Sequence, residues 1–312
     1  GLQVGLIRHI EYGTAFSSLA FGLFYLVLAR WAHGANPLRH RLLTEVFLAL
    51  GMIFASLAIP LALDAQWTSA AWAVEAAGIY WIGQRQNRPL ARAFALLLQA
   101  GAAYAFLRGI RIPGETHLLG GSALGALMLG LSFLSNALVQ RRQAAQPDRR
   151  AQWDDSLGLI FSSLGLWSLF AIAPMLNLHE GTACAWALAG FAVMFAALQW
   201  RLSGWVGNAV LVQIVAIPAL LGTLHPEPGV LLGGSFSAAI LLGASLLGNA
   251  AMLRLHRGAL ENGEYTHDAL LPLFSTLGLW SLYLIAPMQF AAENTACAWA
   301  LAGMLTVFIG LR

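Results

Sequence analysis

Glu75 is the residue best placed to do chemistry in this chain of 312 residues. It lies near the middle of an apolar segment, residues 67–83, which approaches the length of a membrane span. An ionised carboxylate at that depth costs about 3 kcal/mol or more unless it is paired or takes up a proton. Two interpretations follow. Glu75 is a proton- or cation-binding site, or it is a hydrogen-bonded group that fixes helix packing against Gln99, Tyr80 or a backbone carbonyl.

Two further polar residues complete a candidate substrate or proton site. Asp64 precedes the segment that holds Glu75, and Gln99 lies in the middle of the apolar segment 89–107. A glutamine recurs at the same place in a later segment, as Gln213. An amide in the middle of a membrane can hydrogen-bond a neighbouring helix for about 0.6–2 kcal/mol. Because the glutamine recurs, its position favours helix packing over contact with a ligand.

Histidines and carboxylates in the loops predicted to lie at the outer face of the membrane could supply acid–base chemistry on an envelope substrate. The main candidates are His179, Glu180 and His225, with Glu115, His117, Glu227 and Glu293 at other loops or helix ends. His179 and Glu180 are adjacent, which is not the i, i+4 spacing that places two metal ligands on one helix face. Neither a metal-binding spacing nor a glycine-rich phosphate loop occurs, and the chain has no lysine. The sequence therefore predicts no metal and no cofactor, and it favours a protein that is not an enzyme.

The composition requires that lipid covers much of this chain. Hydrophobic residues make up 59% and charged residues 10%, whereas soluble domains contain about 25% charged residues. Runs of about 20 apolar residues are long enough to cross the hydrocarbon layer. Eleven such runs are predicted as helices of an all-α polytopic transmembrane bundle: 10–32, 43–63, 67–83, 89–107, 118–140, 156–178, 181–200, 204–224, 230–254, 268–290 and 295–311.

An internal repeat organises these helices. The stretch FSSLGLWSLFAIAPML at 161–176 returns as FSTLGLWSLYLIAPMQ at 274–289. Further residues recur at offsets of 114 and then 113: Pro60, Pro174 and Pro287, and likewise Trp72, Trp186 and Trp299. One unit then spans four helices, and an even number makes successive units enter the membrane in the same sense, as a direct repeat. The predicted division is 1–42 (last helix of a preceding unit), 43–154, 155–267 and 268–312 (first two helices of a third unit).

The arginines predict the orientation in the membrane. Fourteen of the 17 lie at one face and three at the other, namely Arg8, Arg108 and Arg111. Arginine-rich short loops stay in the cytoplasm. The Gly1 side is therefore predicted outside and the Arg312 side inside. Because the arginines lie in short loops between apolar runs, they do not indicate nucleic acid binding. The expected partners are membrane lipids and other membrane proteins.

The run IPLALDAQWTSAAWAVEAAGIYWIGQRQNRPLARAFALLLQ at 59–99 resembles a signature of a bacterial family of large, predicted multi-pass inner-membrane proteins of unknown function. The matching residues are Pro60, Leu63, Asp64, Trp67, Thr68, Ala71, Trp72, Glu75, Trp81, Gly83, Arg85 and Arg88. The resemblance covers the whole chain loosely and residues 45–107 best. It implies an inner-membrane protein and a longer parent chain, and it implies no activity. Later units depart from the pattern, because Ala189 and Ala302 stand where Glu75 is expected.

Three functional hypotheses follow. The favoured one is a scaffold or envelope-assembly component that binds lipid or membrane partners. The second is a transporter or a lipid or glycan flippase that uses Glu75. The third is a membrane enzyme that acts on a lipid-linked envelope substrate at the outer face.

Overall fold

The computed structural model describes residues 13–35, 41–62, 65–110, 121–144, 152–176, 181–200, 202–256 and 264–310. These residues form helices, with one isolated β-bridge between His225 and Gly233, so the all-α prediction is confirmed. Eleven helices have 19 residues or more: α2 (Gly13–Ala35), α3 (Arg41–Ala62), α4 (Ala65–Arg85), α5 (Pro89–Gly109), α6 (Gly121–Ala144), α7 (Gln152–Phe170), α9 (Gly181–Gln199), α10 (Ser203–Leu221), α11 (Phe236–Leu255), α12 (Glu264–Tyr283) and α14 (Ala292–Gly310). Two short helices, α8 (Ile172–Met175) and α13 (Ile285–Gln289), follow α7 and α12.

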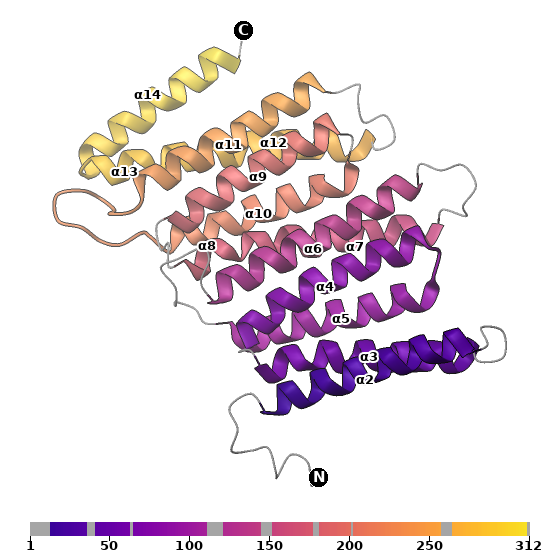
Figure 1. The fold of residues 1–312 in the computed structure, drawn as a ribbon. Coiled ribbons are helices and arrows are strands. Elements are labelled where there is room, and N and C mark those ends of the chain that lie inside the picture. The colour runs from indigo at the N-terminus through magenta and orange to yellow at the C-terminus, as the bar shows by residue number, and fades with distance from the viewer. Residues whose placement is uncertain are drawn as a thin grey trace. The chain divides into compact units, whose positions relative to one another are not determined.

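The described helices fall into two compact units. Unit 1 holds α2 to α6, and unit 2 holds α7 to α14 (Figure 1). This division follows spatial contacts, whereas the predicted boundaries at 42/43, 154/155 and 267/268 follow sequence similarity. Those boundaries remain a prediction.

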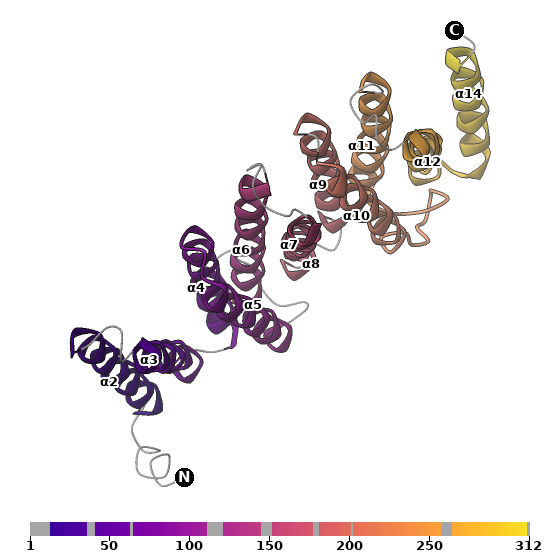
Figure 2. The same ribbon diagram turned by 90° about the vertical axis from the view of Figure 1, so that its right-hand side faces the viewer.

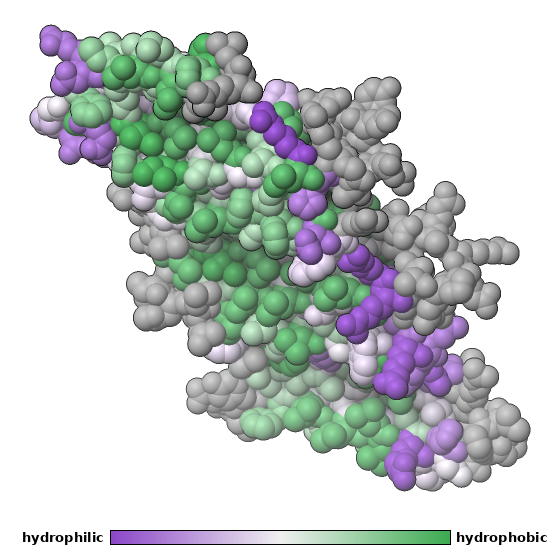
Figure 3. Space-filling view, turned by 90° about the horizontal axis from the view of Figure 1, so that it is seen from above, coloured by the Kyte–Doolittle hydropathy of each residue, from purple (hydrophilic) through white to green (hydrophobic). Residues whose placement is uncertain are grey.

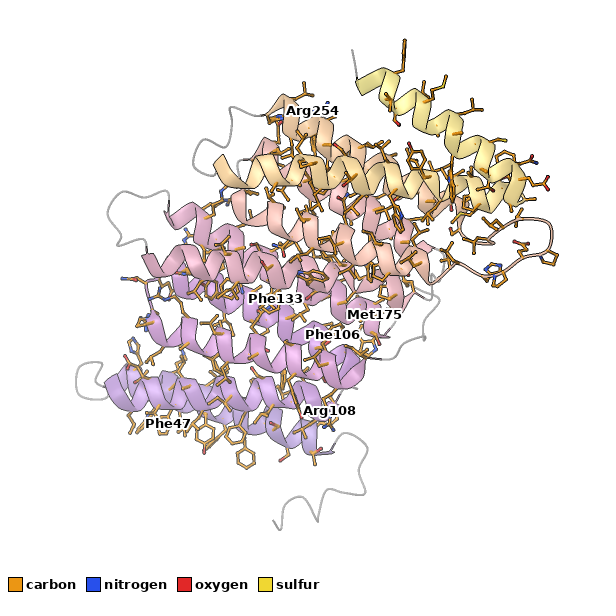
Figure 4. The ribbon with its side chains drawn as sticks, turned by 180° about the vertical axis from the view of Figure 1, so that it is seen from behind. Phe47, Phe106, Arg108, Phe133, Met175 and Arg254 are labelled. Carbon is orange, nitrogen blue, oxygen red and sulfur yellow. The ribbon has the colours of Figure 1, made fainter. Side chains whose placement is uncertain are left out.

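In unit 1, α2 packs along α3, and α4 packs against both α5 and α6 (Figure 2). The α2–α3 pair is close because two glycines face each other. A Cβ on Gly22 would lie 3.1 Å from the carbonyl oxygen of Gly51, and a Cβ on Gly51 would lie 3.1 Å from that of Gly22. Small residues at such crossings let helix backbones approach in lipid. Phe106 of α5 and Phe133 of α6 are buried in this unit (Figure 4).

In unit 2, α9 packs against α10 and α11, and α11 packs against α12. The α11–α12 pair repeats the glycine contact of unit 1. A Cβ on Gly243 would lie 3.1 Å from the carbonyl oxygen of Gly278, and the converse distance is also 3.1 Å. Met175 at the end of α8 is 2% exposed, so the short helix is part of the core (Figure 4).

Two of the predicted spans are interrupted at one residue. The segments 156–178 and 268–290 each divide into a long helix and a short one, at Ala171 and Leu284. The short helices contain Pro174 and Pro287, and proline removes a helical N–H and crowds the carbonyl four residues earlier. The breaks are shallow, because Ala171 and Leu284 keep helical backbone angles.

The predicted span 230–254 also begins too early. Its helix, α11, starts at Phe236, and the residues before it form a turn that ends at Ser235. The Ser235 side chain accepts a hydrogen bond from the backbone N–H of Ala238, which caps the helix. The apolar residues 230–232 misled the prediction, because Leu231 and Leu232 instead bond the backbone of residues at and after α13.

Eight segments of the described residues are long and apolar enough to cross a membrane. They lie in α2, α5, α6, α7–α8, α9, α10, α11 and α12–α13, and α3 contains a shorter apolar segment, Leu43–Ile59. Figure 3 shows one face, on which apolar residues cover the helices and hydrophilic residues gather toward the edges. The eleven predicted helices are thus present as long helices, of which eight contain candidate spans.

Candidate intramembrane polar site

The same hydrogen bond, from a tryptophan to the carbonyl four residues before a proline, occurs three times among the described residues. Each proline lies 12 residues before its tryptophan, as in Pro174 and Trp186. Because proline has no N–H, the carbonyl four residues before it loses its helical donor. The indole N–H of the tryptophan on the next helix donates to that same carbonyl. The three bonds are Trp72 to Ser56 O at 2.9 Å, Trp186 to Phe170 O at 2.7 Å and Trp299 to Tyr283 O at 2.8 Å.

Glu75 lies one turn after Trp72 on α4 and uses the same serine. The Ser56 hydroxyl donates a hydrogen bond of 2.6 Å to Oε1 of Glu75. Ser56 is buried, at 4% exposure. The expected partner was Gln99, Tyr80 or a backbone carbonyl, so the structure gives a different residue for this role. Ser56 thus joins α3 to α4 twice, through its carbonyl and through its hydroxyl.

The second oxygen of Glu75 is buried and finds no hydrogen-bond partner among the described residues. An orphaned oxygen of this kind is expensive in a low-dielectric interior. The side chain is therefore half satisfied. Ala189 of α9 and Ala302 of α14 occupy the positions that correspond to Glu75, and neither is acidic. The Ser56–Glu75 pair is therefore confined to unit 1.

Gln99 belongs to a separate cluster that ties α5 to α6. Its amide nitrogen donates to the Ser132 hydroxyl at 2.6 Å, and its oxygen accepts from Asn136 at 3.5 Å. All three side chains are at most 4% exposed. The interpretation of Gln99 as a helix-packing residue agrees with these contacts, although its assignment as a substrate or proton site remains a prediction.

The same amide cluster recurs in unit 2. Gln213 of α10 donates to the Ser245 hydroxyl of α11 at 3.3 Å, and Asn249 donates to the Gln213 oxygen at 2.8 Å. Gln213 also reaches the carbonyl of Ala187 on α9 at 3.5 Å. We call each set of glutamine, serine and asparagine an amide clamp: Gln99, Ser132 and Asn136 in unit 1, and Gln213, Ser245 and Asn249 in unit 2.

Unit 1 contains a second group of hydrogen-bonded polar side chains. The Tyr80 hydroxyl accepts from Gln84 at 3.0 Å and also from Gln140, and Arg92 donates to Gln84 at 3.3 Å. In unit 2, Met194, Leu198 and Leu253 stand at the positions of Tyr80, Gln84 and Gln140, and all three are at most 3% exposed. Apolar side chains thus fill in unit 2 the space that polar ones fill in unit 1.

The outer-face candidates are only partly visible. Asp64, His179 and Glu180 lie outside the described residues. His225 is exposed, with its Nε2 atom 4.0 Å from a Glu227 oxygen and its Nδ1 atom 3.0 Å from the carbonyl of Thr223. Among the described residues, no group of three or more histidine, cysteine or acidic side chains could hold a metal ion. Convergence of these groups on one cleft stays a prediction.

Sequence reasoning missed Ser56, Ser132 and Ser245 as members of these clusters. Two of them had a detectable signal, because the pattern Ser-x-x-x-Asn occurs at 132–136 and again at 245–249. The spacing of 12 residues between proline and tryptophan was a second such signal. Ser56 had no such signal, because Phe170 of α7 and Tyr283 of α12 stand at the corresponding positions of unit 2.

Comparison with known proteins supports the membrane assignment. Residues 1–113 match the predicted membrane protein family DUF2339. The match confirms the resemblance for the part of the chain that contains α2 to α5, and therefore Ser56, Trp72, Glu75 and Gln99. No curated protein and no solved structure matches the chain. With its candidate spans, the protein is a multi-pass membrane protein.

Proposed function

We propose that this protein is a scaffold or envelope-assembly component of a bacterial inner membrane, which binds lipid and other membrane polypeptides through its helix surfaces. One observation carries the proposal. The indole N–H groups of the tryptophan contacts and the buried amides of the clamps bond neighbouring helices, in equivalent positions of both units. Their chemistry is used to hold helices together.

The same contacts support an architecture of direct four-helix repeats. Trp72, Trp186 and Trp299 each donate to the carbonyl 16 residues earlier. The amide clamps of the two units have matching sequence separations, 33 and 37 residues in unit 1 and 32 and 36 in unit 2. Such agreement in detail is expected of duplicated units and is improbable for unrelated helices.

Large apolar side chains on the helix surfaces support binding to lipid and to other membrane helices. Examples from three helices are Phe16 of α2, Leu97 of α5 and Met304 of α14, which are 66%, 70% and 74% exposed. The orientation proposed from the arginines places the Arg85–Arg92 turn in the cytoplasm. The loop that contains His225 then lies outside.

Site-specific photo-crosslinking in the organism's own membranes tests the assembly role. A photoreactive residue would replace Phe16, Leu97 or Met304 in separate variants, with Leu246, which is 1% exposed, as the buried control. The proposal expects at least one surface variant to crosslink to a defined membrane polypeptide, while the Leu246 variant crosslinks only within the chain. Crosslinks to lipid alone at all three surface positions would contradict an assembly role.

A second candidate function rests on Glu75. Its unpartnered oxygen, buried between helices in unit 1 alone, favours a transporter or flippase in which this carboxyl binds a proton or a substrate group. Purified protein in liposomes separates the two candidates. A transporter gives proton or lipid flux that Glu75→Gln abolishes, whereas a scaffold gives the same flux as protein-free liposomes with either residue at position 75.

A further inference from the structure

Two helices of unit 2 carry an identical stretch of nine residues. The sequence TACAWALAG occupies 182–190 in α9 and 295–303 in α14. Both copies are fixed to the preceding helix in the same way, by the bonds from Trp186 to Phe170 O and from Trp299 to Tyr283 O. Because the anchor is the same, corresponding residues of α9 and α14 point in the same direction relative to the helix that holds them.

In α9 one face of the stretch is covered by the α10–α11 hairpin. Ala183 and Ala187 are fully buried. A Cβ on Gly190 would overlap Cγ of Gln213, so the clamp glutamine rests directly on the glycine. Phe191, the residue after the stretch, lies against Gly248 of α11.

In α14 the equivalent face is bare in the part of the chain that the structure describes. Ala296 and Ala300 are exposed, and a Cβ on Gly303 would meet no atom within 4 Å. Met304, which corresponds to Phe191, is 74% exposed. Figures 1 and 2 show α14 beside α12 and α13, with no hairpin on its other side. We call Ala296, Ala300, Gly303 and Met304 the α14 seat.

Some residues of α14 are exposed in the α9 copy as well, so their exposure does not indicate a binding surface. Leu301 is 69% exposed, but its counterpart in α9, Leu188, is also 51% exposed although the α10–α11 hairpin packs on that helix. This side of both helices therefore faces lipid. The α14 seat differs, because the counterparts of its two alanines and its glycine, namely Ala183, Ala187 and Gly190, are buried under the α10–α11 hairpin, and the counterpart of Met304, Phe191, is half-buried.

We propose that the α14 seat binds a transmembrane helical hairpin from outside residues 1–312, with the pattern of α10–α11. Its first helix carries a mid-membrane glutamine that rests on Gly303 and donates to the carbonyl of Ala300. Its second helix carries the Ser-x-x-x-Asn pair that holds the glutamine. This partner assignment rests on the assembly role proposed above.

A second copy of this chain does not fit the seat in its folded form. Its two hairpins of the required pattern, α5–α6 and α10–α11, already pack on α4 and α9. On α4 and α9 the hairpins cover the face that corresponds to the α14 seat. Ala76 of α4, which is 0% exposed, stands at the position of Gly190 and Gly303. The occupant is therefore a further hairpin of the same chemistry.

Cys297 allows a direct test. In α9 the equivalent Cys184 has its Sγ atom 3.8 Å from the Ser237 hydroxyl of α11. The probe is a separate polypeptide of residues 202–256 in which Ser237→Cys has been introduced, added in lipid nanodiscs to the full chain carrying Cys184→Ala. The proposal expects a disulfide between the probe and Cys297. It also expects loss of that disulfide on Gly303→Leu in the full chain or Gln213→Leu in the probe.

The matched control is Leu301→Phe, on the lipid-facing side, which should leave the crosslink unchanged. Gly303→Leu fills open space, and circular dichroism checks that this variant folds. Absence of the crosslink, its persistence in Gly303→Leu, or a Cys297–Cys297 dimer that excludes the probe would each overturn the proposal. If the α14 seat rejects the probe while Phe16 or Leu97 still crosslinks to a membrane polypeptide, this inference fails and the assembly role stands.

Discussion

The pairing of Pro174 with Trp186 makes a quantitative prediction. The indole of Trp186 donates to Phe170 O at 2.7 Å, a distance at the short end of N–H···O hydrogen bonds. That carbonyl has no helical donor, because Pro174 stands four residues later. Trp186→Phe should therefore leave a buried acceptor unpaired and cost about 1–2 kcal/mol of unfolding free energy from the lost hydrogen bond.

Pro174→Ala restores a backbone N–H that can donate to the same carbonyl. In that background Trp186→Phe should cost about 1 kcal/mol less, because the carbonyl keeps a partner. The loss of indole volume is common to both backgrounds and cancels from the cycle. The measurement is reversible unfolding of the purified protein in mixed micelles with increasing denaturing detergent, followed by circular dichroism.

Trp200→Phe serves as the control for this cycle, since Trp200 is 58% exposed at the end of α9. Its effect should be additive with that of Pro174→Ala. If Trp186→Phe costs the same with proline or alanine at 174, the tryptophan does not compensate for the proline, and the reasoning fails.

Three further predictions concern the clamps, the glycine crossings and the orientation. Gln213→Leu should destabilise unit 2 by about 1–2 kcal/mol, because Asn249 loses the oxygen to which it donates. Adding Asn249→Leu should recover part of that loss, because the buried amide that lost its acceptor is then removed, and the same unfolding assay measures both variants. Gly243→Leu should cost about 1–3 kcal/mol, because a Cβ there already lies 2.7 Å from a leucine side chain of α12. A fluorescent protein that matures only in the cytoplasm should fluoresce when fused after Asn87, and alkaline phosphatase should be active when fused after Pro228. The reverse result would refute the orientation.

Much of the helical architecture could be predicted from the sequence. Hydropathy and length locate the helices, because a span must satisfy its backbone internally over about 20 residues. The predicted helices differ in detail from the structure where a local group changes the backbone. Pro174 and Pro287 divide two helices, and Ser235 starts α11 after a turn that apolar residues had concealed.

The candidate site was less predictable. Glu75 and Gln99 were found because a polar residue in an apolar segment stands out, but their partners lie on other helices. Ser56 is small and common in such segments, so nothing in its own surroundings marks it as the donor to Glu75. Interhelical partners depend on helix rotation, which hydropathy does not fix.

A structure of the chain in lipid nanodiscs, resolving side chains and water around Glu75, tests most directly the claim that these polar groups fasten helices. The account predicts that Ser56 and Trp72 hold the contact between α3 and α4, with no column of water reaching the Glu75 carboxyl. A hydrated passage from either membrane face to that carboxyl would contradict the account and establish a transport path.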